Sequence, residues 1–226
     1  MNLRELDLFD DDIHQPFFWE GGAKAALLVH GFPGTPAEVR PLARALHQRG
    51  WTVQAPLLPG FGPQIHELFT RRKEDWITAV FDAYTTLRAS YDTVLLLGYS
   101  LGGAVALNVA ARSAPDGLAL LAPFWQIGGP VYAFLWQGIK QIFPEIQLFK
   151  HVDFSNPTVQ NIFADWRRVL DLDDPQVQEA LQELRVPAQF VDEVLALGEA
   201  AKAAAPAIRL PTLVVQGSED KTISPK

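Results

Sequence analysis

Residues 98–103 read Gly98-Tyr99-Ser100-Leu101-Gly102-Gly103, and they give the clearest indication of the architecture. An apolar run typical of a buried strand precedes them at 93–97, and a stretch typical of a helix follows at 104–107. A serine with a glycine two residues before and two after, placed between a strand and a helix, matches a nucleophile elbow. The alternative is a glycine-rich turn whose serine only caps the helix.

The bulk composition describes a globular chain with no sign of nucleic-acid binding. At 226 residues it fits one α/β domain with an inserted subdomain, and 48% hydrophobic residues allow a large core. The net charge of −7 gives no reason to expect nucleic acid as a partner, since that needs clustered Lys and Arg. The chain has no cysteine, which excludes disulfides, thiolate catalysis and cysteine-ligated metals.

No targeting or membrane segment is visible in the sequence. Residues 1–7 are charged and lack the apolar region of a secretory signal. No apolar run reaches the roughly 18–20 residues of a membrane span. We therefore expect a cytoplasmic protein with no stable membrane insertion, while its oligomeric state stays open.

Apolar strands and helices alternate through the first half of the chain. Strands are predicted at 17–19, 25–29, 52–55, 93–97 and 117–122, with helices at 36–49 and 74–90. Thr35, Pro36 and Glu38 predict an N-cap, a first helical residue and a capping box, and Gly50 ends that helix. The alternation predicts an α/β fold: a mostly parallel sheet with helices on both faces.

The alternation stops at Pro123 and resumes at 211–217. We read 124–206, which shows no clear strand and many aromatics, as a helical cap inserted after the sixth strand. The core is then 1–123 and 207–226. Residues 130–143 are apolar nearly all round. Their side chains either pack the cap onto the main domain or line an acyl-binding groove.

Ester hydrolysis by a serine needs a nucleophile, a base, a carboxylate that orients the base, and donors for the oxyanion. We assign Ser100 as nucleophile and the N–H of Leu101, at the start of a helix, as one oxyanion donor. Pro33 has no N–H, so we assign the second donor to the N–H of Phe32, whose ring could wall the pocket. His30 fits a structural role in this loop better than that of general base.

The chain resembles the α/β-hydrolases, in particular their bacterial carboxylesterase and monoacylglycerol-lipase branch. The resemblance covers about 20–123 and 207–226, and it rests on four motifs in this order: His30-Gly31-Phe32-Pro33-Gly34, Pro59-Gly60-Phe61-Gly62, Gly98 to Gly103, and Gly217-Ser218-Glu219-Asp220. It implies an α/β-hydrolase fold with no cofactor and no metal.

The resemblance also implies the acid of the triad. In such enzymes the acid lies in a Gly-x-x-Asp turn after a strand, which selects Asp220 over Glu219; an ordinary turn residue is the alternative. Family members often have histidine at the position of Phe61, which is outside the triad.

The family order of the triad is Ser, Asp, His, yet no histidine follows Asp220. The last strand and closing helix of the family are also missing, which would leave an apolar edge strand exposed. We therefore expect a C-terminally truncated sequence, with the catalytic histidine beyond residue 226. The five histidines present are His14, His30, His47, His66 and His151. Of these, His151 in the cap is a weaker alternative base.

These inferences lead to one main function and two alternatives. The main hypothesis is a serine carboxylesterase that hydrolyses short- to medium-chain acyl esters or monoacylglycerols through an acyl-enzyme, and that is nearly inactive as the truncated chain. The alternatives are a non-catalytic ligand-binding relative, and a thioesterase or perhydrolase of the same fold.

Overall fold

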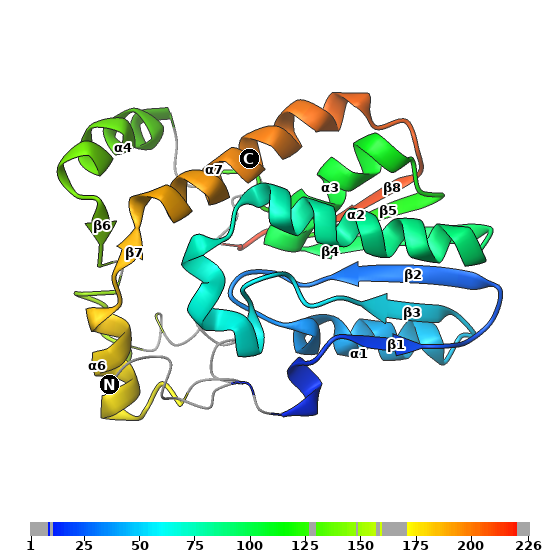
Figure 1. Ribbon diagram of the computed structural model, residues 1–226, viewed down its shortest axis with the longest axis horizontal. Helices are drawn as coiled ribbons and strands as arrows, with labels where there is room; N and C mark the ends of the chain where they lie inside the picture. Colours follow the sequence, from blue (N-terminus) through cyan, green and yellow to red (C-terminus); the bar gives the residue numbers. More distant parts are fainter. Residues whose placement is uncertain are drawn as a thin grey trace.

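A six-stranded sheet forms the centre of the molecule (Figure 1). The computed structural model describes residues 9, 11–126, 130–147, 149–156, 159 and 171–220. The order across the sheet is β1-β3-β2-β4-β5-β8. The strands are β1 (Phe17–Trp19), β2 (Lys24–Val29), β3 (Thr52–Ala55), β4 (Thr93–Tyr99), β5 (Gly117–Leu121) and β8 (Thr212–Val215). Each strand expected from the sequence is present, with ends that differ by at most two residues.

The sheet is parallel except for β1, which pairs antiparallel with β3 at one edge. In the register, Val29 is level with Gly98, Tyr99 with Leu121, and Leu121 with Val215. Residues that follow β2, β4 and β8 therefore leave the sheet at the same edge. Ligands of parallel α/β sheets bind at this carboxyl edge.

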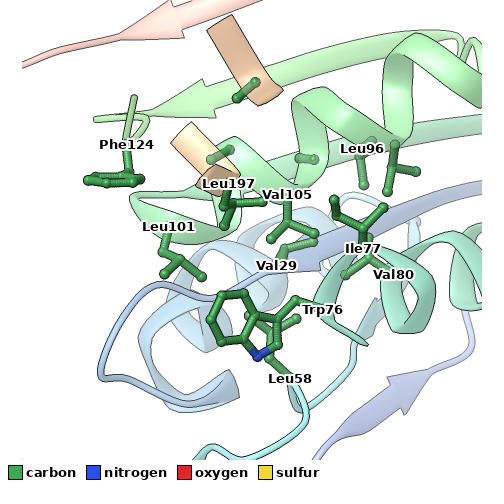
Figure 2. Close-up of a cluster of buried hydrophobic side chains, with 14 of the residues drawn as sticks. Val29, Leu58, Trp76, Ile77, Val80, Leu96, Leu101, Val105, Phe124 and Leu197 are labelled. Carbon is green, nitrogen blue, oxygen red and sulfur yellow. The ribbon is translucent and has the colours of Figure 1, made fainter. Parts of the chain in front are cut away.

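Helices cover both faces of the sheet, as expected. The side chains of β2 alternate: Ala25, Leu27 and Val29 join the core cluster on one face, while Ala26 and Leu28 join the cluster on the other. The first cluster, part of which is shown in Figure 2, is closed by α2 (Lys73–Ser90), α3 (Leu101–Ser113) and α7 (Ala188–Ala204). The second is closed by α1 (Pro36–His47).

Helix α1 begins where the sequence predicts and ends at His47, two residues before the predicted end. The Thr35 hydroxyl accepts a hydrogen bond from the Ala37 N–H, and Gly50, with φ of +81°, follows the end of the helix. Glu38 was expected to complete a capping box. Its carboxylate accepts from the Gly31 N–H at 2.9 Å, which ties the helix to the loop after β2.

The segment between β5 and α7 contains α4 (Pro130–Ile142), α6 (Pro175–Glu183) and a short ladder of β6 (Glu145–Ile146) with β7 (Val186–Pro187). The expectation that this segment has no strand was therefore wrong. These elements lie beyond the carboxyl ends of the parallel strands (Figure 1). In the described part of the chain the insertion follows the fifth strand, not the sixth. The division into 1–123, 124–206 and 207–226 stays a prediction.

Two further features complete the fold. A 3-10 helix, η3 (Gly62–Thr70), lies between β3 and α2. Strand β8 pairs with β5, and all four of its residues are exposed, Leu213 to 60%. Among the described helices, none combines the length and the apolar character needed to cross a bilayer.

Candidate active site

Ser100 occupies a tight turn between β4 and α3, and its backbone conformation is rare for a residue with a side chain. Its φ is +52° and its ψ is −118°. Three backbone hydrogen bonds of 2.9 Å hold the turn: the Ser100 N–H donates to Leu121 O, and Ser100 O accepts from the N–H groups of Gly103 and Phe124. A strained conformation fixed by its surroundings is typical of functional positions.

The glycines of this turn are required by space. A Cβ added at Gly98 would lie 2.3 Å from the carbonyl oxygen of Gly102. A Cβ added at Gly102 would lie 2.3 Å from the carbonyl oxygen of His30. Both contacts are with backbone, which cannot move aside as a flexible side chain can. The glycine pattern therefore reflects how closely α3 approaches β4 and the end of β2.

The loop after β2 lies directly beside Ser100. A Cβ added at Gly31 would be 3.0 Å from the Ser100 Cβ, and Phe32 follows in the chain. Leu101 is the first residue of α3, where N–H groups have no acceptor within the helix and the helix dipole favours negative charge. The structure thus brings together three residues selected from the sequence: Ser100, Leu101 and Phe32.

His30 is fully buried, and both of its ring nitrogens are occupied. The Leu58 N–H donates to Nε2 at 3.0 Å, which requires an unprotonated Nε2; Nδ1 then carries the proton and donates to Gly31 O at 3.0 Å. Burial lowers the pKa of His30 to about 4, so the ring is neutral at physiological pH. This geometry is that of a side chain that holds the loop beside Ser100.

The other histidines are engaged elsewhere or exposed. His14 is buried against the Thr35 hydroxyl at 2.9 Å, and burial lowers its pKa. His47 Nδ1 lies 3.2 Å from Trp51 O. His66 is exposed beside Glu67, and His151 is exposed in a turn. Across the described residues, no histidine hydrogen bonds to Ser100.

Asp220 follows β8 at the same sheet edge as Ser100. Its N–H donates to Gly217 O at 3.3 Å, and its Oδ2 accepts from Gln216 Nε2 at 2.9 Å. Strands β4 and β8 are separated only by β5, which corresponds to a lateral distance of about 10 Å. Asp220 and Ser100 thus lie at one edge of the sheet, two strands apart.

An aromatic cluster surrounds Phe32, a residue that is 38% exposed. Its ring centroid lies 6.0 Å from that of Phe61 and 6.0 Å from that of Phe190 on α7. Phe69 and Trp76 extend the cluster by packing against Phe190. Sequence reasoning missed Phe190, because a lone phenylalanine in an apolar helix has no local signal of its partners.

The apolar helix α4 matches only part of its expectation. Trp136 is buried and packs onto the main core, as the packing alternative requires. Leu135, Ile139, Ile142 and Phe143 are instead exposed, between 43% and 72%. The side chains of 130–134, and those of Phe163 and Trp166, lie outside the described residues.

The sheet, the helices on both faces and the serine turn at its carboxyl edge define an α/β-hydrolase. The chain belongs to the Hydrolase_4 family, described as serine aminopeptidase S33, whose model matches residues 23–226.

Two curated relatives from Bacillus are similar in sequence. A carboxylesterase of Bacillus subtilis (strain 168) is 43% identical over 176 residues, which is 70% of this chain and 70% of the relative. A thermostable monoacylglycerol lipase of Bacillus sp. (strain H-257) is 38% identical over 102 residues, which is 45% of this chain and 40% of the relative. These relatives support an ester hydrolase of the carboxylesterase and lipase type.

Solved structures agree on the fold. The structure reported for two metagenome-derived lipolytic enzymes, LipS and LipT, has a TM-score of 0.70 at 22% identity, and the match covers 95% of this chain and 80% of that one. A monoacylglycerol lipase of Paleococcus ferrophilus has a TM-score of 0.65 at 20% identity, with 93% and 79% covered.

Proposed function

We propose that the protein is a serine carboxylesterase that hydrolyses short- to medium-chain acyl esters or monoacylglycerols. The observation that carries this proposal is the turn at Ser100, which holds a serine at positive φ beside the Gly31–Phe32 loop at the carboxyl edge of the sheet. The carboxylesterase and monoacylglycerol lipase among its relatives support the choice of ester substrate.

The first half of the reaction transfers the acyl group to Ser100. Its Oγ attacks the ester carbonyl carbon while its proton passes to a general base. The N–H groups of Leu101 and Phe32 stabilise the oxyanion that forms. Collapse of this intermediate breaks the bond to the alcohol oxygen, which leaves with the proton from the base.

The second half hydrolyses the acyl-enzyme. Water gives a proton to the base and attacks the acyl carbon, and the same two N–H groups stabilise the second oxyanion. Collapse releases the carboxylic acid and returns the proton to Ser100 Oγ. No cofactor or metal takes part in either half of the cycle.

We assign Asp220 as the carboxylate that orients the base. The base would be a histidine placed between Asp220 and Ser100, which in the family order of the triad follows the acid. Two findings support this assignment: both nitrogens of His30 are occupied, and the remaining histidines contact other groups or are exposed. The 226-residue chain by itself should accordingly have little activity.

The acyl chain would lie against the aromatic cluster around Phe32. Phe32 is partly exposed and its ring packs against Phe61 and Phe190, so it offers an apolar surface in the loop that lies against Ser100. Such a wall favours acyl groups over charged or highly polar substituents.

The test is hydrolysis of p-nitrophenyl butyrate and octanoate by the 226-residue chain and by the chain extended with any native residues that follow Lys226. We expect activity in the extended chain, and a loss of roughly 10⁴-fold or more in kcat for Ser100→Ala. Ser113→Ala is the matched control, because Ser113 lies at the far end of α3 and its hydroxyl donates to Val109 O.

Two results would contradict the proposal. One is an extended chain in which Ser100→Ala hydrolyses both esters as fast as the unmodified protein. The other is an extended chain that binds fatty acids but turns over neither these esters nor thioesters, which would favour a ligand-binding relative.

A further inference from the structure

Over the described side chains of helix α4, the contacts with α7 come from one face of the helix. Among its described side chains, at 135–142, Trp136 alone is buried. Its ring belongs to the core cluster that also contains Leu101 and Phe124. Its indole N–H is bonded to Asp192, which lies two residues after Phe190 on α7, and Phe190 packs against Phe32 in the loop beside Ser100.

Both carboxylate oxygens of Asp192 on α7 accept hydrogen bonds from side chains of α4. Trp136 Nε1 donates to Oδ1 at 2.8 Å, and Lys140 Nζ donates to Oδ2 at 2.9 Å. Trp136 and Lys140 are four residues apart and therefore lie on the same face of α4. The two side chains of the ion pair are only 37% and 25% exposed, so solvent screens it less than a fully exposed pair.

The helix that carries Asp192 is itself firmly packed. Phe190 and Leu197 are buried in the main core, and the Glu193 carboxylate accepts from the Lys73 N–H at the start of α2, at 3.1 Å. A Cβ added at Gly198 would lie 2.5 Å from the carbonyl oxygen of Trp125. Asp192 is therefore a fixed point, and α4 is the element whose position depends on it.

We propose that Asp192 is a positioning residue that determines acyl-chain preference by holding α4 beyond the carboxyl edge of the sheet. This inference rests on the proposed esterase function. Short acyl chains end near the Phe32 ring and do not reach α4. Longer chains extend toward the cap, so they lose binding contacts when α4 is released from Asp192.

The test compares p-nitrophenyl butyrate with octanoate in the extended chain. Asp192→Ala removes both acceptors and should raise KM for octanoate by roughly tenfold, the size of one charge-assisted hydrogen bond, with kcat and the KM for butyrate unchanged. Glu199→Ala is the matched control, because Glu199 is an exposed carboxylate on the same helix. It should leave both esters unaffected.

Three milder variants test the hydrogen bond to Trp136 and the ion pair with Lys140 separately. Asp192→Asn keeps an acceptor for the indole but removes the ion pair, and Lys140→Met removes the same pair from the other side. Both should give an intermediate KM for octanoate, and the double variant should be no worse than either alone. Trp136→Phe keeps an aromatic ring in the core, removes only the N–H donor, and should also be intermediate.

Trypsin supplies a readout that does not need activity. Cleavage after Lys140 should be faster in Asp192→Asn than in the unmodified protein, because α4 opens more readily. Unchanged cleavage together with equal effects on butyrate and octanoate would overturn the inference. A fully active Ser100→Ala variant would instead overturn the esterase proposal, while the trypsin result would still decide whether Asp192 holds α4.

Discussion

The turn at Ser100 and the cap helix α4 face the same edge of the sheet, yet different forces hold them in place. At the turn, backbone approaches backbone so closely that a Cβ at Gly98 or Gly102 would lie 2.3 Å from a carbonyl oxygen. Among the described side chains of α4, one buried tryptophan and one ion pair make contact with α7, and a Cβ at Gly138 would meet nothing within 4 Å.

This difference matches the different demands of catalysis and of acyl-chain binding. Bond-making atoms must be placed within a fraction of an ångström, and steric exclusion does this without relying on any one polar contact. An acyl chain needs only an apolar surface of suitable extent, which a helix held by a few side chains can provide. The rigid region therefore bears the proposed nucleophile, and the loosely held region bears the proposed specificity.

The largest expected effect comes from making the same substitution in both regions. Gly102→Ala should destabilise the protein by about 3 kcal/mol or more, because its Cβ would collide with the backbone of His30 and Val29. Gly138→Ala should stabilise it by about 0.5–1 kcal/mol, because Gly138 lies in an exposed part of α4 with open space around it. Urea unfolding followed by circular dichroism measures both.

Equal effects of the two substitutions would remove the contrast between the regions. A Gly102→Ala variant as stable as the unmodified protein would show that the turn can relax. A Gly138→Ala variant that is clearly destabilised would show that α4 is packed more tightly than its exposure indicates.

The next effect concerns pH and the loop that lies against the turn. The pKa of His30 is about 4 in the folded state and near 6.5 in the unfolded state, so the unfolded chain binds more protons between these values. The stability contributed by neutral His30 is present above pH 6.5 and is lost as the pH falls toward 4. Between pH 7 and pH 5 the loss should be about 2 kcal/mol.

Urea unfolding at pH 7 and pH 5 measures this loss. His30→Gln should reduce it, since the glutamine does not titrate, while His66→Gln should leave it unchanged because His66 is exposed. Burial lowers the pKa of His14 as well, and its contribution is common to all three proteins. An identical pH dependence in His30→Gln would show that His30 does not couple the loop to pH.

The turn and its sheet could be predicted from the sequence because their requirements act on single residue types. Only glycine tolerates the backbone contacts at 98 and 102, and apolar runs mark buried parallel strands. The loop at Phe32 was found for a similar reason, since one of its glycines, Gly31, lies against Ser100. Structure that depends on the size of single residues can therefore be predicted from a short stretch of sequence.

The contacts of α4 and α7 could not be predicted, because they pair ordinary residues far apart in the chain. Asp192 meets Trp136 and Lys140 across more than 50 residues, and Phe190 meets Phe32 from another helix. None of these residues stands out within its own segment. The two-residue ladder of β6 and β7 was missed for a similar reason, since strands this short have no recognisable period.

The smallest expected effect tests whether the apolar side chains of α4 contribute to stability. Ile142 is 72% exposed, so Ile142→Ser should change the free energy of unfolding by no more than about 0.5 kcal/mol. Ile77 is the matched residue on α2: it is 3% exposed, and Ile77→Ser should cost about 3 kcal/mol or more through a cavity and a buried hydroxyl. Urea unfolding of both variants measures the difference. A large loss at Ile142 would mean that α4 is covered in solution, and the attachment through Trp136 and Asp192 would then no longer account for its position.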